Sequence, residues 1–352
     1  MDEPGRSAGE AEGLRGRATS VGLFLVTGLC VYWVYGSQWM QGDPFADRET
    51  AAGAARFAAG LMGLLLAHEM GHYLVARAHG FRLSLPFFLP VPFAFGTFGA
   101  IIQLRSLPRS RTALLEMGAA GPLAGFAVAL LLFALGLPGT QAHEQPELVV
   151  ASAQVLAELA AVPAPEPGWI DAWFAAPPLS WIFPVPPPGT VPMLILANPP
   201  IMDLVGLLVL GRVPGRYDVL DPLAMAGWVG CLVTAVNLLP VGQLDGGHIF
   251  NALSPRHALR LSRLGVALAF VAGLVWPGWA FWGLLLLGLR AWRSLPVPLY
   301  PPPTGRARVV AALAVLTLLA CLMPRPLEVE HLRLDQLRFV TPAGEPLALP
   351  SP

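Results

Sequence analysis

Residues 53–77 read GAARFAAGLMGLLLAHEMGHYLVAR, an apolar stretch with two histidines and a glutamate near its far end. A helix needs about 20 residues to cross a bilayer, and this stretch is long enough. In a helix, His68 and His72 are four positions apart and lie on one face. Ionisable side chains inside a membrane segment are costly unless they pair or bind something. The stretch therefore predicts a membrane helix that carries a functional polar cluster.

The motif His68-Glu69-Met70-Gly71-His72 favours a metal site within this helix. Two imidazoles on one helical face can hold one Zn²⁺, and the intervening Glu69 can act on water at the metal. The competing interpretation is a buried, hydrogen-bonded cluster without metal.

A catalytic zinc site takes three protein ligands and keeps one position open. Asp245 is the best candidate for the third ligand, because it is the acidic residue at the end of the apolar segment 222–241. The glycines that follow it, Gly246 and Gly247, permit close backbone approach. His248 competes with Asp245 for this role.

The composition supports a membrane protein. Of 352 residues, 55% are hydrophobic and only 12% are charged, whereas soluble globular domains are about 25% charged. This excludes disordered and fibrous classes and disfavours a soluble enzyme. The net charge is zero, so nothing attracts the chain to nucleic acid. We expect the lipid bilayer, and no nucleic acid, among its partners.

The distribution of apolar segments predicts an all-α polytopic membrane protein with about six transmembrane helices. Segment 264–292 is either one kinked span or a tight helical hairpin, since Trp276-Pro277-Gly278-Trp279 interrupts it. Segment 193–210 is an interfacial helix or a half-span. A mobile tail is expected at 1–19, a first span with its connection at 20–52, and a second tail at 324–352. The expected spans are 21–40, 53–77, 113–137, 222–241, 264–292 and 307–323.

Residues 84–104 are apolar but rich in proline and glycine. Pro86, Pro90 and Pro92 argue against a helix, and Gly96 and Gly99 follow them. Irregular backbone at membrane depth must lie against protein or a water-filled cavity. We predict a short re-entrant β-like element beside the metal-binding helix.

The arginines predict the orientation, because loops rich in basic residues face the cytoplasm. The Pro-rich loop 138–192 contains no arginine and should face outward. The N-terminus and the metal site are then on the cytoplasmic side of the membrane, which we expect to be a bacterial cytoplasmic (inner) membrane. The arginines that set this orientation are Arg77, Arg82, Arg105, Arg109, Arg111, Arg256, Arg260 and Arg263.

Three motifs in order, HEMGH (68–72), GPLAG (121–125) and NLLPVGQLDGGH (237–248), resemble the site-2 protease family of intramembrane zinc metalloproteases. The segment 96–125 is also similar to compact members that include chloroplast and cyanobacterial homologues. The resemblance implies that His68, His72 and Asp245 bind one Zn²⁺ per chain and that Glu69 is the catalytic acid/base. It also implies that Asn237 handles substrate.

The resemblance further implies regulated intramembrane proteolysis, in which peptide bonds within or near transmembrane segments of membrane-protein substrates are hydrolysed. The metalloprotease core would be 53–250, followed by C-terminal spans at 251–323. Many members carry a PDZ or CBS domain, and we expect neither here. One alternative is a zinc-binding, non-proteolytic chaperone or assembly factor, and a metal transporter is another. Residues 86–102 are a candidate edge with which an unwound substrate pairs as an added strand.

Overall fold

The computed structural model shows a mostly helical chain. Its three long helices are α1 (Pro4–Val34), α2 (Arg48–Ala78) and α3 (Arg111–Gly136). A π-helical turn, η1 (Tyr35–Trp39), extends α1, and a 3₁₀ turn, η2 (Leu137–Gly139), extends α3. The shorter helices are α7 (Pro200–Leu210), α8 (Pro222–Asn237), α9 (Asp245–Leu253), α10 (Ala258–Ala272), α11 (Pro277–Gly288) and α12 (Gly305–Cys321). The structure describes residues 4–81, 83–102, 106, 108, 110–149, 190–293, 296–298, 301–333, 336–341 and 346–347.

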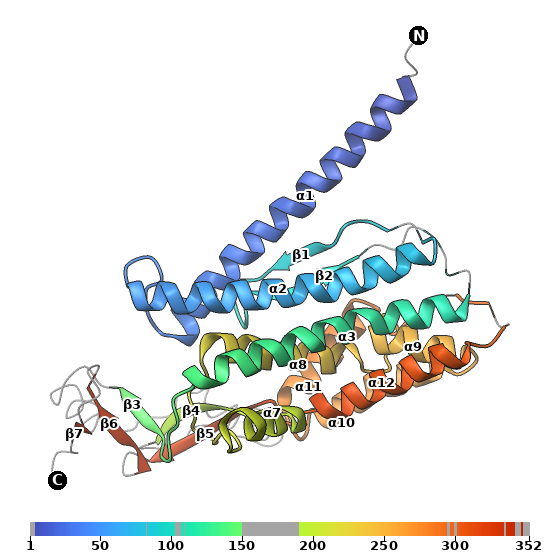
Figure 1. Cartoon of the computed structure of the whole chain (residues 1–352). Helices are drawn as coiled ribbons and strands as arrows, with labels where there is room; N and C mark the ends of the chain where they lie inside the picture. Colours follow the sequence, from blue (N-terminus) through green and yellow to red (C-terminus); the bar gives the residue numbers. More distant parts are fainter. Residues whose placement is uncertain are drawn as a thin grey trace, which may run out of the picture.

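Side-chain caps fix where α2 and α3 begin. The Asp47 carboxylate accepts a hydrogen bond from the Thr50 N–H at 2.7 Å. The Ser110 hydroxyl accepts one from the Ala113 N–H at 3.1 Å. Each cap satisfies a backbone donor that the first helical turn leaves free. Helix α2, which carries HEMGH, and helix α3, which carries GPLAG, therefore begin at defined residues. The two helices pack side by side (Figure 1).

Helices α2, α3 and α8 form the centre of the bundle (Figure 1). The side chains of Phe57, Phe133 and Trp228, one from each helix, are fully buried there. Helix α8 comes close to α3 at Gly227, where an added Cβ would lie 2.6 Å from the Ala129 carbonyl oxygen. Small residues allow such close approach between membrane helices.

Three helical segments are long and apolar enough to cross a membrane: Gly16–Trp39, Arg48–Ala78 and Arg111–Gly139. These correspond to the first three predicted spans. Helices α7, α8 and α11 are apolar but shorter, so six full spans are not apparent among the described residues. Segment 264–292 lies in two packed helices, α10 and α11, as the hairpin interpretation predicted.

The predicted β-like element is an antiparallel hairpin of β1 (Phe87–Pro90) and β2 (Thr97–Ile101). It packs mainly on α1 and contacts α2 through β2 (Figure 1).

Two further small sheets were not part of the all-α prediction. Strand β4 (Thr190–Leu196) pairs antiparallel with β5 (Leu327–Arg333). Strand β3 (Glu147–Val149) pairs with β6 (Arg338–Val340), which pairs with β7 (Pro346–Leu347). The β4–β5 and β3–β6 pairings join segments more than a hundred residues apart, so no local pattern in the sequence predicts them.

Both expected tails contain regular structure where the structure describes them. Helix α1 begins at Pro4, within the expected tail 1–19. Proline is favoured in the first turn of a helix because its fixed φ angle is helical. The C-terminal segment supplies β5, β6 and β7. Most of the loop 138–192 lies outside the described residues, as do Arg82, Arg105 and Arg109.

Several helix termini lie close together at one end of the bundle, which we call the metal end. The Arg111 guanidinium at the start of α3 donates to the carbonyl oxygens of Ala252 and Leu253 at the end of α9. The Thr304 N–H just before α12 donates to the Thr112 hydroxyl at 3.2 Å. The ends of α2 and α8 and the starts of α3 and α12 therefore lie together, while β3 to β7 lie at the opposite end (Figure 1).

Candidate metal centre

Three side chains from two helices converge inside the metal end. The Nε2 atoms of His68 and His72 lie 3.2 Å apart. The Asp245 Oδ2 atom lies 3.2 Å from each of these nitrogens. The three atoms form a nearly equilateral triangle, which we call the ligand triangle. Among the described residues, this is the group of His, Cys, Asp and Glu side chains whose ligand atoms lie within 4.8 Å of one another.

Local structure explains why α9 can bring Asp245 to α2. Asp245 is the first residue of α9, directly after the tight turn 238–244. A Cβ at Gly246 would lie 2.0 Å from the Leu238 carbonyl oxygen, and one at Gly247 would lie 2.5 Å from the Val241 carbonyl oxygen. Only glycine lets the helix start so close to the preceding turn.

Helix α3 orients the His72 imidazole. Its Nδ1 lies 2.8 Å from the Met117 carbonyl oxygen. A backbone carbonyl can only accept, so His72 carries its proton on Nδ1 and presents Nε2 to the ligand triangle. Metal-binding histidines typically make such a second hydrogen bond, which fixes the tautomer and the ring orientation.

The GPLAG glycines give the histidines their space. A Cβ at Gly121 would lie 2.0 Å from the His72 Nε2, and a Cβ at Gly125 would lie 3.1 Å from the His68 Nδ1. In the sequence, these glycines stood out only as part of the GPLAG motif. Their spacing of four residues matches that of the two histidines, and that match is the signal that could have revealed the relationship.

Glu69 is buried beside the ligand triangle without belonging to it. Its side chain is 7% exposed, and its carboxylate is close enough to His72 and Asp245 to interact with both electrostatically. A buried carboxylate next to a potential metal position is well placed to exchange a proton there.

The two other candidates lie outside the triangle. His248 follows Asp245 by one helical turn, and its Nδ1 is buried without a hydrogen-bond partner among the described residues. Asn237 is the last residue of α8 and is half-buried. The geometry therefore places Asp245, and not His248, with the motif histidines. The role of Asn237 stays a prediction.

Arg111 is a structural residue that the sequence indicated only as part of a basic loop. Its side chain is 8% exposed, and it caps α9 through the carbonyl oxygens of Ala252 and Leu253. Charge-assisted hydrogen bonds of this kind are stronger than neutral ones. Arg111 thereby fastens to α3 the helix that begins with Asp245.

The donor set fits Zn²⁺. Zinc binds imidazole nitrogen and carboxylate oxygen at about 2.0–2.2 Å in tetrahedral sites. Tetrahedral bonds of that length place neighbouring donor atoms roughly 3.3–3.6 Å apart. The observed separations of 3.2 Å lie close to the lower end of this spacing. Two nitrogens and one oxygen also leave the fourth position open, as a catalytic site requires.

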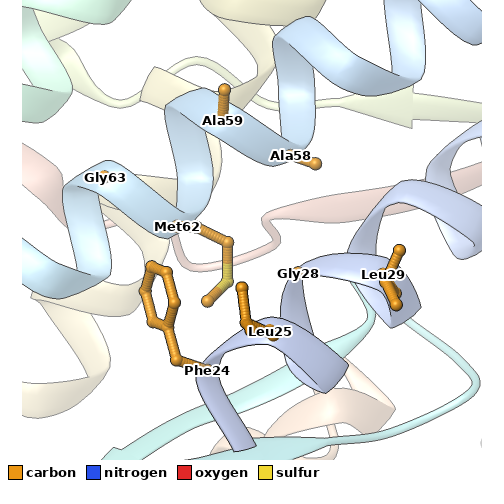
Figure 2. A pocket seen from close by; sticks show the side chains of 8 residues that line it. All are labelled: Phe24, Leu25, Gly28, Leu29, Ala58, Ala59, Met62 and Gly63. Carbon is orange, nitrogen blue, oxygen red and sulfur yellow. The ribbon is translucent and has the colours of Figure 1, made fainter. Parts of the chain in front are cut away.

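An apolar groove of about 600 Å³ lies between α1 and α2 (Figure 2). Met62 forms part of its α2 wall and precedes Glu69 by two helical turns, so both lie on one face of α2. The groove is lined by Phe24, Leu25, Gly28, Leu29, Ala58, Ala59, Met62 and Gly63.

The fold and the site together define a helical membrane protein with a buried His-His-Asp centre and an adjacent glutamate, an arrangement suited to a metal-dependent hydrolase. Comparison with known protein families identifies the family to which the chain belongs. The sequence profile of peptidase family M50 matches residues 56–275. The chain belongs to this family of site-2 proteases.

Plant proteins are among its relatives. The chain is 31% identical over 226 residues to "Probable zinc metalloprotease EGY2, chloroplastic" of Arabidopsis thaliana, covering 63% of this chain and 33% of that protein. It is 30% identical over 219 residues to "Probable zinc metalloprotease EGY1, chloroplastic" of the same plant, covering 61% and 32%. The chain thus spans about a third of the length of these relatives. No solved structure matches it.

Proposed function

We propose that this chain is a zinc metalloprotease of the site-2 type, which hydrolyses peptide bonds within or near transmembrane segments of other membrane proteins. The ligand triangle, with Glu69 beside it in a membrane helix, is the observation that carries the proposal. Membership of peptidase family M50 supports it. Such cleavage would serve regulated intramembrane proteolysis.

Each residue has a defined task in this reaction. His68, His72 and Asp245 would hold Zn²⁺, which supplies Lewis acidity and makes water a stronger acid. Glu69 takes a proton from the attacking water and returns it to the leaving amine. The Met117 carbonyl keeps the His72 tautomer correct for binding. Burial of the site limits access by bulk water, which strengthens each of these electrostatic interactions.

The groove between α1 and α2 is the proposed approach for the substrate helix. Its lining is apolar, it lies between two membrane-length helices, and its α2 wall continues along one face toward Glu69. The test is Gly63→Leu, because Gly63 lines the groove and a Cβ added there has no atom within 4 Å, so the larger side chain begins in open space. We expect KM for a single-span substrate to rise severalfold, with kcat and zinc content unchanged.

A matched control for the groove is Gly22→Leu, on α1 outside the lining, where the added side chain also has open space. This variant should behave as wild type. If Gly63→Leu and Gly22→Leu give the same KM as wild type, the groove holds only lipid and the substrate approaches elsewhere.

Substrate pairing with the edge of the β1–β2 hairpin stays a prediction. A helical substrate must expose its backbone before cleavage, and an added strand would hold it open. Proline at Thr97 or Ala100 removes a backbone donor from β2. Unchanged cleavage by both variants would contradict the pairing.

The arginines of the metal end support an orientation toward the cytoplasm. Carboxylates are few at this end, whereas arginines at the opposite end have acidic partners, such as Arg56 with Asp221 at 2.7 Å. We propose that α8 and α12 also lie within the membrane and that the metal end faces the cytoplasm. The arginines described at the metal end are Arg77, Arg111, Arg256, Arg260, Arg263, Arg290, Arg293, Arg306 and Arg308.

The direct test is cleavage of a single-span membrane substrate by the purified full chain. We expect cleavage that a zinc chelator abolishes and that added Zn²⁺ restores. A chain that binds zinc but cleaves none of a panel of single-span substrates would favour the non-proteolytic alternative. That alternative is less favoured because Glu69 and all three candidate ligands are present at the site.

A further inference from the structure

The C-terminal part of the chain carries an excess of positive charge. Residues 246–327 contain eight arginines and no aspartate or glutamate. Of these arginines, Arg325 alone has an acidic partner among the described residues, Glu328 at 3.9 Å. Arg263 lies in α10 and Arg293 follows α11, and both side chains are exposed. Neither forms an ion pair with any of the described residues. Such basic groups at a membrane surface attract anionic lipid headgroups.

These two arginines meet at one aromatic ring. The Arg263 guanidinium carbon lies 5.2 Å from the centroid of the Trp292 ring, and that of Arg293 lies 5.6 Å from it. The ring attracts each cation, but the two like charges repel each other. An anion bound to both guanidinium groups would remove the repulsion and accept bidentate hydrogen bonds.

The surroundings indicate that the anion carries apolar chains. Leu264 and Leu268 on α10 are 52% and 55% exposed, and Leu287 and Leu289 at the end of α11 are 50% and 67% exposed. Exposed leucines therefore follow Arg263 directly in the chain and precede Arg293 by four residues. Tryptophan beside such a boundary is typical of the membrane interface.

We propose that Arg263, Trp292 and Arg293 bind the phosphate headgroup of an acidic phospholipid, whose acyl chains lie on the exposed leucines of α10 and α11. We call these three residues the lipid site. The binding itself does not depend on proteolysis.

The lipid site adjoins the turn that leads into Asp245. The Gly242 N–H donates to the hydroxyl of Ser262, the neighbour of Arg263, at 2.8 Å. The Gln243 N–H donates to the carbonyl oxygen of Ala291, the neighbour of Trp292, at 2.7 Å. A lipid that holds α10 and the end of α11 together therefore also stabilises the turn before α9.

The test compares full-length protein in nanodiscs of phosphatidylcholine alone and of phosphatidylcholine with phosphatidylglycerol. We expect phosphatidylglycerol to raise the Tm of the wild type and to have little effect on the double variant Arg263→Gln/Arg293→Gln. Loss of both charges should weaken the apparent affinity for phosphatidylglycerol about tenfold or more. Arg325→Gln is the control, because Arg325 is an exposed arginine at the opposite end of α12 whose charge is paired with Glu328 at 3.9 Å. It should keep the full shift.

Two further measurements separate the remaining outcomes. Inorganic phosphate added to the phosphatidylcholine sample should not reproduce the shift, and if it does, the site binds a free anion and not a lipid. Lipid retained by the wild type through detergent exchange should be enriched in phosphatidylglycerol, which tests the proposal even if the double variant fails to fold. An equal Tm shift in wild type and double variant, or no enrichment, would overturn it.

Discussion

Replacing Glu69 by glutamine should abolish most of the cleavage while leaving zinc in place. Glutamine has nearly the same shape, so the buried position beside His72 and Asp245 stays filled. It cannot take a proton from water or return one to the leaving amine. General acid–base catalysis contributes about 10²- to 10⁴-fold, and we expect kcat to fall by that factor. The measurement is kcat together with zinc per chain for wild type and Glu69→Gln.

The paired readout distinguishes a catalytic role from a structural one. If Glu69 only stabilised the ligand triangle, the glutamine variant would lose zinc and activity together. Full cleavage by Glu69→Gln would contradict its assignment as acid/base.

Adding one methyl group to α3 should empty the metal site. In Gly121→Ala the new Cβ would lie 2.0 Å from the His72 Nε2 and 2.4 Å from its Cδ2, far inside van der Waals contact. The imidazole can turn aside more easily than the backbone of α3 can move, so the fold survives and the ligand is displaced. Loss of an outer-shell partner already costs about 10- to 100-fold in metal affinity, and displacing the ligand itself should cost more.

Gly63→Ala is the control for this prediction. It introduces the same methyl group on α2, the helix of both histidines, where no atom lies within 4 Å. It should bind zinc as the wild type does and keep its Tm. Normal zinc content in Gly121→Ala, measured on folded protein, would mean that His72 is not a ligand.

The local parts of this account could be predicted from the sequence. His68, Glu69 and His72 lie within five residues of one helix, so the helical period alone places the two imidazoles on one face. The prolines of 84–104 excluded a helix, and a hairpin is found there. The break at Trp276-Pro277 predicted two helices as one of two alternatives.

Contacts between residues far apart in the sequence could not be predicted without the structure. From spacing alone, Asp245 and His248 were both possible ligands, because they lie on one face of the same short helix; only the position of α9 against α2 separates them. The hydrogen bond between His72 and the Met117 carbonyl, and the space that Gly121 leaves for the His72 ring, depend on how α3 packs against α2. The hydrophobic periodicity of the sequence does not predict that packing. The pairing of Thr190 with Arg333 joins two segments that lie more than a hundred residues apart in the sequence.

Zinc content is the measurement that tests the ligand triangle most directly, compared among wild type, Asp245→Ala and His248→Ala, each shown to be folded by its Tm. We predict one zinc per chain in the wild type and in His248→Ala, and loss of most of it in Asp245→Ala. Retention of zinc by Asp245→Ala with loss by His248→Ala, or no zinc in the folded wild type, would contradict the account.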